Sequence, residues 1–211
     1  MATSVDNSRA ERQWFIVGRW QEYGGEERAN LIRVAAIGAF YLVELVNFHW
    51  FGGGSDELRV FHNQATALAL AWVFTALGVA YCLRSGVFPA ALKFLSTGVD
   101  LVLLTALADA SQAGANSPLV FAYFVVISLA GMRLSLRLVW FATVGAMLGY
   151  LYLVGHSDPV WFDADHTVRP VEQCLALLSL AFSGIVLGQI VRSVRSIADD
   201  YARRLAREER V

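Results

Sequence analysis

The chain has 211 residues, 56% of them hydrophobic, and its mean hydropathy is +0.49. A soluble domain of this size rarely carries so large an apolar fraction, so the composition indicates an integral membrane protein. The formal net charge is only −1, and no basic stripe is interleaved with aromatic residues, which excludes a typical nucleic-acid-binding surface.

Six apolar stretches approach the length of about 20 mostly apolar residues that a membrane-spanning helix needs. They cover residues 31–50, 61–82, 93–110, 118–135, 137–155 and 171–191. Asp100 and Asp109 interrupt the third stretch, and only the segment RLSLR separates the fourth from the fifth, which predicts a tight helical hairpin. We therefore expect an all-α integral membrane protein built as a six-transmembrane-helix bundle, with its membrane domain over residues 31–191.

A polar N-terminal segment, residues 1–30, precedes the bundle. Its stretch RQWFIVGRWQEYGG sets Trp14 and Trp20 beside charged residues, which is typical of an amphipathic helix in the headgroup layer. A short cap packed under the bundle is the alternative. The Gly24-Gly25 pair that follows predicts a break before the first span.

The distribution of lysine and arginine predicts the orientation of the chain, because cytoplasmic segments are enriched in these residues. If the N-terminus is cytoplasmic, every basic residue except Arg59 and Arg169 falls on the cytoplasmic side of the six-span scheme. We therefore expect both termini to be cytoplasmic.

The last span continues into a charged segment, residues 192–211, without glycine or proline. Ile190, Val194, Ile197, Tyr201 and Leu205 follow one another at spacings of 4, 3, 4 and 4, so they form an apolar stripe on one helix face. Such a stripe indicates a cytoplasmic signalling helix that pairs with a second copy in a parallel homodimer. A solvated basic tail whose arginines contact anionic membrane lipids is the alternative.

The segments ALKFLSTGVDLVLLT, SPLVFAYFVVISLAGMRLSL and ARRLAREERV, within six short-looped spans, carry a resemblance. The chain resembles the membrane anchor and signalling helix of bacterial class III adenylate cyclases, and it is similar to six-span membrane domains of bacterial sensor kinases. The resemblance implies a receptor or anchor domain in the bacterial inner membrane. Such a domain senses an outer-face or intramembrane ligand and signals to a fused or associated cytoplasmic effector, such as a nucleotide cyclase.

No catalytic motif, neither a cyclase metal site nor a kinase signature, occurs in the 211 residues. We therefore expect the non-catalytic membrane part of such a protein, either an anchor separated from its effector or a stand-alone relative. The competing interpretation is a free-standing membrane subunit that binds haem or metal in a redox complex.

Two polar residues interrupt the apolar stretches on their cytoplasmic side. An ionisable group inside a bilayer is costly unless it is paired, so Asp100 is expected to face the bundle interior and to bond Arg133 or Arg137. Gln189, near the inner end of the last span, is expected to hydrogen-bond another helix.

The segment NFHWFGGGSDELRVFHNQ brings His49 and His62 to similar depth on two neighbouring helices, with Glu44 below them. The other histidines, His156 and His166, fall on the same outer side. Histidine and carboxylate together suit a divalent metal such as zinc, so His49, His62 and Glu44 are candidate ligands. A b-type haem between the two histidines and ordinary interfacial polar residues are the alternatives.

Overall fold

The computed structural model describes residues 2–51, 56–85, 89, 91–111, 113–157 and 168–208. Within these ranges all regular secondary structure is helical, with no β-strand. The elements are α1 (Ala2–Val46), the π-helical turn η1 (Asn47–Phe51), α2 (Asp56–Arg84), α3 (Leu92–Ala110), the 3-10 turns η2 (Gly114–Asn116) and η3 (Pro118–Phe121), α4 (Ala122–Met132), α5 (Leu136–Ser157) and α6 (Pro170–Glu208).

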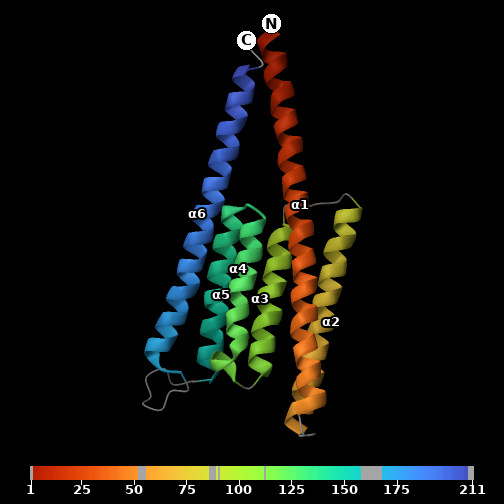
Figure 1. Cartoon of the computed structure of the whole chain (residues 1–211), viewed down its shortest axis with the longest axis vertical. Helices are drawn as coiled ribbons and strands as arrows, with labels where there is room; N and C mark the ends of the chain where they lie inside the picture. The colour runs from red at the N-terminus through yellow and green to blue at the C-terminus, as the bar shows by residue number, and fades with distance from the viewer. Residues whose placement is uncertain are drawn as a thin grey trace.

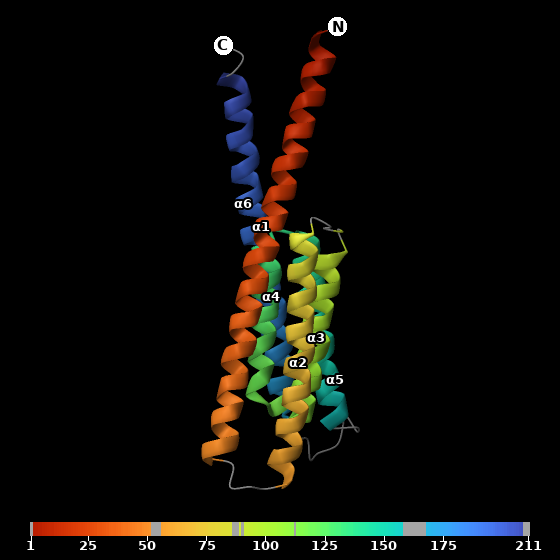
Figure 2. The ribbon, with the colours of Figure 1, turned by 90° about the vertical axis from the view of Figure 1, so that its right-hand side faces the viewer.

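The long helices run side by side as a bundle, and two of them extend well beyond it (Figures 1 and 2). The N-terminal part of α1 and the C-terminal part of α6 leave the bundle at the same end, which we call the projecting end (Figure 1). The beginnings of α2 and α6 and the C-terminal end of α5 lie at the opposite end (Figures 1 and 2). The two helices with the longest extensions therefore share one side of the molecule.

The prediction of an all-helical, apolar architecture is confirmed. In the described part of the chain, four helical stretches are long and apolar enough to cross a membrane: Tyr23–Trp50, Asp56–Arg84, Leu136–Ser157 and Pro170–Tyr201. The other two predicted spans are also helical, but α3 carries Lys93, Asp100 and Asp109, and the helical stretch Pro118–Met132 is short. The hairpin at RLSLR is present, with α4 ending at Met132 and α5 beginning at Leu136.

The predicted break at Gly24-Gly25 is wrong, because α1 is continuous from Ala2 to Val46. A Cβ atom at Gly25 would lie 3.4 Å from both Arg133 Cα and Met132 O. The absence of a side chain at this position therefore lets α1 approach the end of α4 closely, and the glycine does not end the helix.

Helix α5 packs against α3, α4 and α6. Its apolar side chains interlock with those of α3 and α4 in one continuous core. Fully buried members of this core are Ala108, Tyr123, Ile127, Ala130, Leu138, Ala142, Ala146 and Leu153. By contrast, α1 and α2 are mostly exposed along their outer faces, as is expected of helices that contact lipid rather than water.

Small residues set the separation between α5 and its neighbours. Gly145 faces Leu101 of α3, where a Cβ would come within 2.5 Å of Leu101 Cδ1. On α6, a Cβ at Gly184 would lie 2.6 Å from Thr143 Cγ2 and 2.9 Å from Thr143 Cβ. Thr143 is buried, and its hydroxyl donates to Val139 O at 2.8 Å, so its side chain has little freedom to move.

Gly184→Ala is therefore expected to lower the free energy of unfolding by about 1–3 kcal/mol, the typical cost of overpacking a filled interface. Gly78→Ala on α2 is the matched control, because nothing lies within 4 Å of a Cβ at that position. Thermal unfolding of the purified protein in detergent measures both variants. Equal stability of the two variants would show that α5 and α6 do not pack as closely as described.

Candidate functional site

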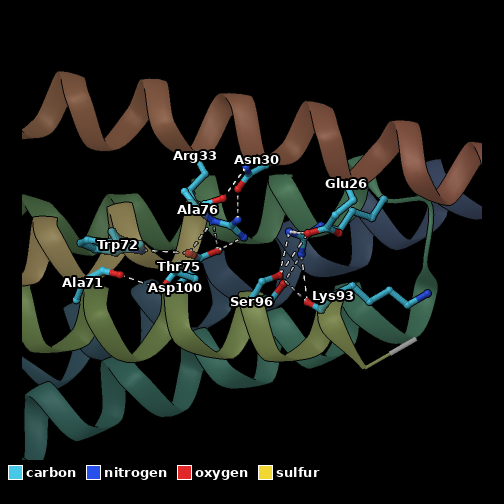
Figure 3. A network of polar contacts seen from close by, with 12 residues as sticks. Glu26, Asn30, Arg33, Ala71, Trp72, Thr75, Ala76, Lys93, Ser96 and Asp100 are labelled. Carbon is cyan, nitrogen blue, oxygen red and sulfur yellow. Dashed lines mark hydrogen bonds and ion pairs between the residues drawn. The ribbon is translucent and has the colours of Figure 1, made fainter. Parts of the chain in front are cut away.

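A network of buried polar side chains lies near the projecting end and joins α1, α2, α3 and the turn after α4 (Figure 3). Helix α1 contributes Glu26, Asn30 and Arg33, whose spacings of four and three residues place them on one face. All three side chains are buried. This face of α1 therefore directs polar and charged groups into the bundle.

The first half of the network is the ion pair between Arg33 on α1 and Asp100 on α3. Arg33 Nε donates to Asp100 Oδ1 at 2.9 Å and to Oδ2 at 3.0 Å, and Nη2 donates to Oδ2 at 2.8 Å. Trp72 Nε1 on α2 donates to Oδ1 at 3.1 Å. Arg33 Nη1 donates to Asn30 Oδ1 at 2.8 Å, and Asn30 Nδ2 donates to Ala76 O at 3.1 Å. Three helices are thus tied together around one carboxylate.

The second half is the ion pair between Glu26 on α1 and Arg133, the residue that follows α4. Arg133 Nη2 donates to Glu26 Oε1 at 2.8 Å and to Ser96 Oγ at 3.3 Å. Arg133 Nη1 donates to Thr97 Oγ1 at 2.5 Å and to Lys93 O at 3.3 Å. Because both charged side chains are at least 95% buried, their opposite charges compensate a desolvation cost of several kcal/mol for each ion.

The network holds two carboxylates and two guanidinium groups, so its formal charge is zero. Both ion pairs cross from α1 to another helix, which makes them the main polar attachment of α1 to the bundle. The charged groups are two carboxylates, each held by a guanidinium donor, and a guanidinium group stays protonated and supplies neither a nucleophile nor a general base. The arrangement suits mechanical coupling between helices rather than bond chemistry.

The predicted partner of Asp100 is wrong in part. Asp100 is buried and bonded between helices as expected, but its partner is Arg33. Arg133 binds Glu26 instead, while Arg137 is exposed. From the sequence, Arg33 was expected to be a cytoplasmic charge, and Glu26 was expected to belong to a separate N-terminal segment. The spacing of Glu26, Asn30 and Arg33 places them on one helix face, and this spacing is the sequence signal that could have identified them as partners of charges inside the bundle.

A second polar contact lies at the opposite end, between Glu44 on α1 and His62 on α2. His62 Nδ1 and Glu44 Oε1 are 3.6 Å apart, close enough for an ion pair with a protonated imidazole but too far for a hydrogen bond. Neither atom has a hydrogen-bond partner among the described residues, although both are buried. The imidazole ring stacks on Phe48 at 4.1 Å and faces Tyr41 at 6.4 Å between ring centroids.

The structure does not gather the three predicted metal ligands. Glu44 and His62 are adjacent, but His49 is exposed, and its Nδ1 is 2.9 Å from Leu45 O within its own helix. The described residues contain no group of three or more His, Cys, Asp or Glu side chains placed to hold a metal ion. The π-helical turn Asn47–Phe51 explains the difference, because its i→i+5 geometry changes the direction in which side chains leave the helix.

The remaining predicted residues lie on the surface. His156 is exposed, with Nε2 3.8 Å from Asp109 Oδ1, and His166 lies outside the described residues. Gln189 is exposed on α6, without the interhelical hydrogen bond expected of it among the described residues. The side chains of Leu205 and of residues 2–22 also lie outside the described part. The other members of the apolar stripe, Ile190, Val194, Ile197 and Tyr201, are all exposed.

A cavity of about 420 Å³ lies between α1, α2, α3 and the η3–α4 segment, and it extends from one polar contact to the other. Arg33, Trp72 and Asp100 line the end nearer the network, and Glu44 and Asn47 line the opposite end. Between them the lining is almost entirely apolar. The residues of this apolar part include Ile37, Phe40, Ala65, Ala69, Leu104, Ala122, Val126 and Leu129.

Comparisons of the chain with known proteins give no assignment: no protein-family model, no curated protein and no solved structure matches it.

Proposed function

We propose that the chain is a six-span membrane receptor and anchor domain that senses a ligand at its outer face or within the membrane. It passes the signal through α6 to a cytoplasmic effector, such as a nucleotide cyclase, in the bacterial inner membrane. The observation that supports this most strongly is the continuity of α6, which runs from Pro170 to Glu208 without interruption. One rigid element thus connects the opposite end of the bundle with the space beyond the projecting end (Figure 1).

The length of α6 exceeds what a membrane crossing requires. Its 39 residues, at a rise of 1.5 Å each, span roughly 58 Å, whereas the hydrocarbon core of a bilayer is about 30 Å thick. The surplus forms a charged helix that begins near Arg192. A displacement or rotation of α6 within the bundle would therefore be carried directly to its far end.

The exposed stripe on α6 supports pairing with a second copy of the chain. Ile197 and Tyr201 are 66% and 67% exposed, although they lie on a helix rich in charged residues. Apolar side chains in such positions are stabilised by burial against a partner helix, as in a coiled coil. Gln189 lies just before the stripe, and an exposed amide at membrane depth is favoured where another helix can accept its hydrogen bond.

Six crossings with both ends on the cytoplasmic side agree with the placement of α1 and α6 at the projecting end (Figure 2). Helix α3 qualifies as a crossing in this scheme because Asp100, its central charge, is neutralised by Arg33. The helical stretch Pro118–Met132 is short for a crossing, but it is continued at the projecting end by the tight turn to α5.

Disulfide crosslinking in native membranes tests the proposal. In a background without Cys82 and Cys174, cysteines at Val194 or Ile197 are expected to form disulfides between protomers several times faster than cysteines at Ser193 or Ser196. The serines are the matched controls, because they are also exposed but lie off the stripe. Equal crosslinking at all four positions would indicate an unpaired, mobile tail and would contradict transmission through a helical dimer.

A further inference from the structure

We propose that the cavity between α1, α2, α3 and α4 is the ligand site of this receptor. Its ligand would be a single-chain lipid with a small, uncharged, hydroxyl-bearing head. The inference rests on the proposed function, and it adds the position of the site and the chemical class of the ligand. It is carried by three features: the shape of the cavity, its apolar wall, and a carboxylate oxygen at one of its ends that lacks a hydrogen-bond donor among the described residues.

The shape of the cavity fits an extended chain. It reaches along α1 from Arg33 to Asn47, which is roughly 21 Å at the rise of an α-helix. The volume of about 420 Å³ is spread over that length in an elongated, partly open site, within the range of about 300–1,000 Å³ that is usual for small-molecule sites. The wall between the two ends offers apolar side chains, and no charged group interrupts it.

The two polar ends of the cavity differ in their capacity to bind a head group. At the network end, the Asp100 carboxylate already accepts hydrogen bonds from Arg33 and Trp72, so it is saturated. At the opposite end, Glu44 lines the cavity, and its Oε1 atom accepts no hydrogen bond among the described residues, with only His62 Nδ1 3.6 Å away. A ligand head is therefore expected at Glu44, and the chain of the ligand is expected to point toward Trp72.

The polar groups at the Glu44 end of the cavity determine which head group can bind there. A hydroxyl group donates one hydrogen bond and accepts another, so it can donate to the Glu44 carboxylate and accept from a neighbouring amide. A carboxylate or phosphate head would bring a second negative charge beside Glu44 in a site of low dielectric constant, where like charges repel strongly. Asn47, which lines the same end, provides a further donor and acceptor. The site should therefore accept long-chain alcohols and reject fatty acids of equal length.

The test uses the purified full chain in detergent and a sixteen-carbon primary alcohol that carries a photoreactive diazirine at the far end of its chain. Labelling is mapped by mass spectrometry, and unlabelled alcohol and the sixteen-carbon fatty acid compete with the probe. We expect saturable labelling of residues near Trp72 and Leu104, with the acid competing at least about tenfold less well than the alcohol. Ala69→Phe, which fills the cavity, should abolish this labelling. Val144→Phe on the exposed face of α5 is the control and should leave the labelling unchanged.

Glu44→Leu should weaken the alcohol about tenfold, because a hydrogen bond to a charged group is lost, and it should also remove the preference over the acid. Diffuse labelling that excess alcohol does not displace, or equal competition by acid and alcohol, would overturn the inference. Crosslinking at Val194 and Ile197, measured in the same samples, separates it from the proposed function. Saturable binding without a paired α6 would contradict the receptor function alone, whereas a paired α6 without saturable binding would contradict the ligand site alone.

Discussion

Asp100→Leu is expected to lower the free energy of unfolding by about 3–5 kcal/mol, the largest loss that we expect from any single substitution in this chain. The variant leaves the Arg33 guanidinium buried, with Asn30 as its only remaining hydrogen-bond partner in the part of the chain that the structure describes. It also removes the acceptor of Trp72 Nε1. A buried, uncompensated charge costs more than the pair contributes, because its desolvation is no longer offset.

The double variant Arg33→Met with Asp100→Leu distinguishes a lost ion pair from damaged packing. Removing both charges leaves no unpaired ion, so most of the stability lost in Asp100→Leu is expected to return. Asp109→Leu is the matched control on the same helix, because Asp109 is partly exposed and lies 3.8 Å from an exposed histidine. Its loss should stay below about 1 kcal/mol. Thermal unfolding in detergent measures all three variants, and equal losses for Asp100→Leu and Asp109→Leu would contradict the buried pair.

Glu26→Gln is expected to lower stability by about 3 kcal/mol and to loosen α1 from the end of α4. Glutamine keeps the size of the side chain but removes the charge that balances Arg133, which is 95% buried. Arg133 keeps its hydrogen bonds to Ser96, Thr97 and the Lys93 carbonyl, but none of these three partners carries a negative charge. The loss of stability should be largest in the part of α1 that contributes side chains to the network.

Hydrogen–deuterium exchange gives the local readout for this variant. Backbone amides between residues 23 and 33 are expected to exchange faster in Glu26→Gln, because the opening of this segment becomes less costly. Glu27→Gln is the matched control, since Glu27 is adjacent in sequence but exposed. If the two variants exchange alike, the Glu26–Arg133 contact does not attach α1 to the bundle.

The helices themselves were predictable from the sequence, because a run of apolar residues long enough to cross a bilayer has few other stable conformations. All six predicted stretches are helical, and the RLSLR turn lies where it was expected. The continuity of α1 through Gly24-Gly25 was not predictable from composition. Glycine pairs often end helices, and only the proximity of the α4 end shows that here the pair permits close packing.

The pairing of the charges was less accessible to sequence analysis. That Asp100 needed a partner followed from its position in an apolar stretch, but helical spacing alone does not identify the neighbouring helix or its rotation. Arg133, one of its expected partners, binds a different carboxylate, and the structure pairs Asp100 with Arg33. Likewise, His49 and His62 were expected to lie together, but His49, within the π-helical turn, is exposed, and Phe48 stacks on His62.

The central claim of this account is that a change in the bundle reaches the effector as a motion of the continuous helix α6. Insertions after Arg192 test it most directly, in the full chain joined to a reporter domain that is active only when its two copies pair. Two inserted residues rotate the following helix by about 200°, whereas seven return it to within about 20° of its original direction. We predict that the two-residue insertion changes reporter activity and that the seven-residue insertion restores it. Activity that does not depend on the length of the insertion would contradict transmission through α6.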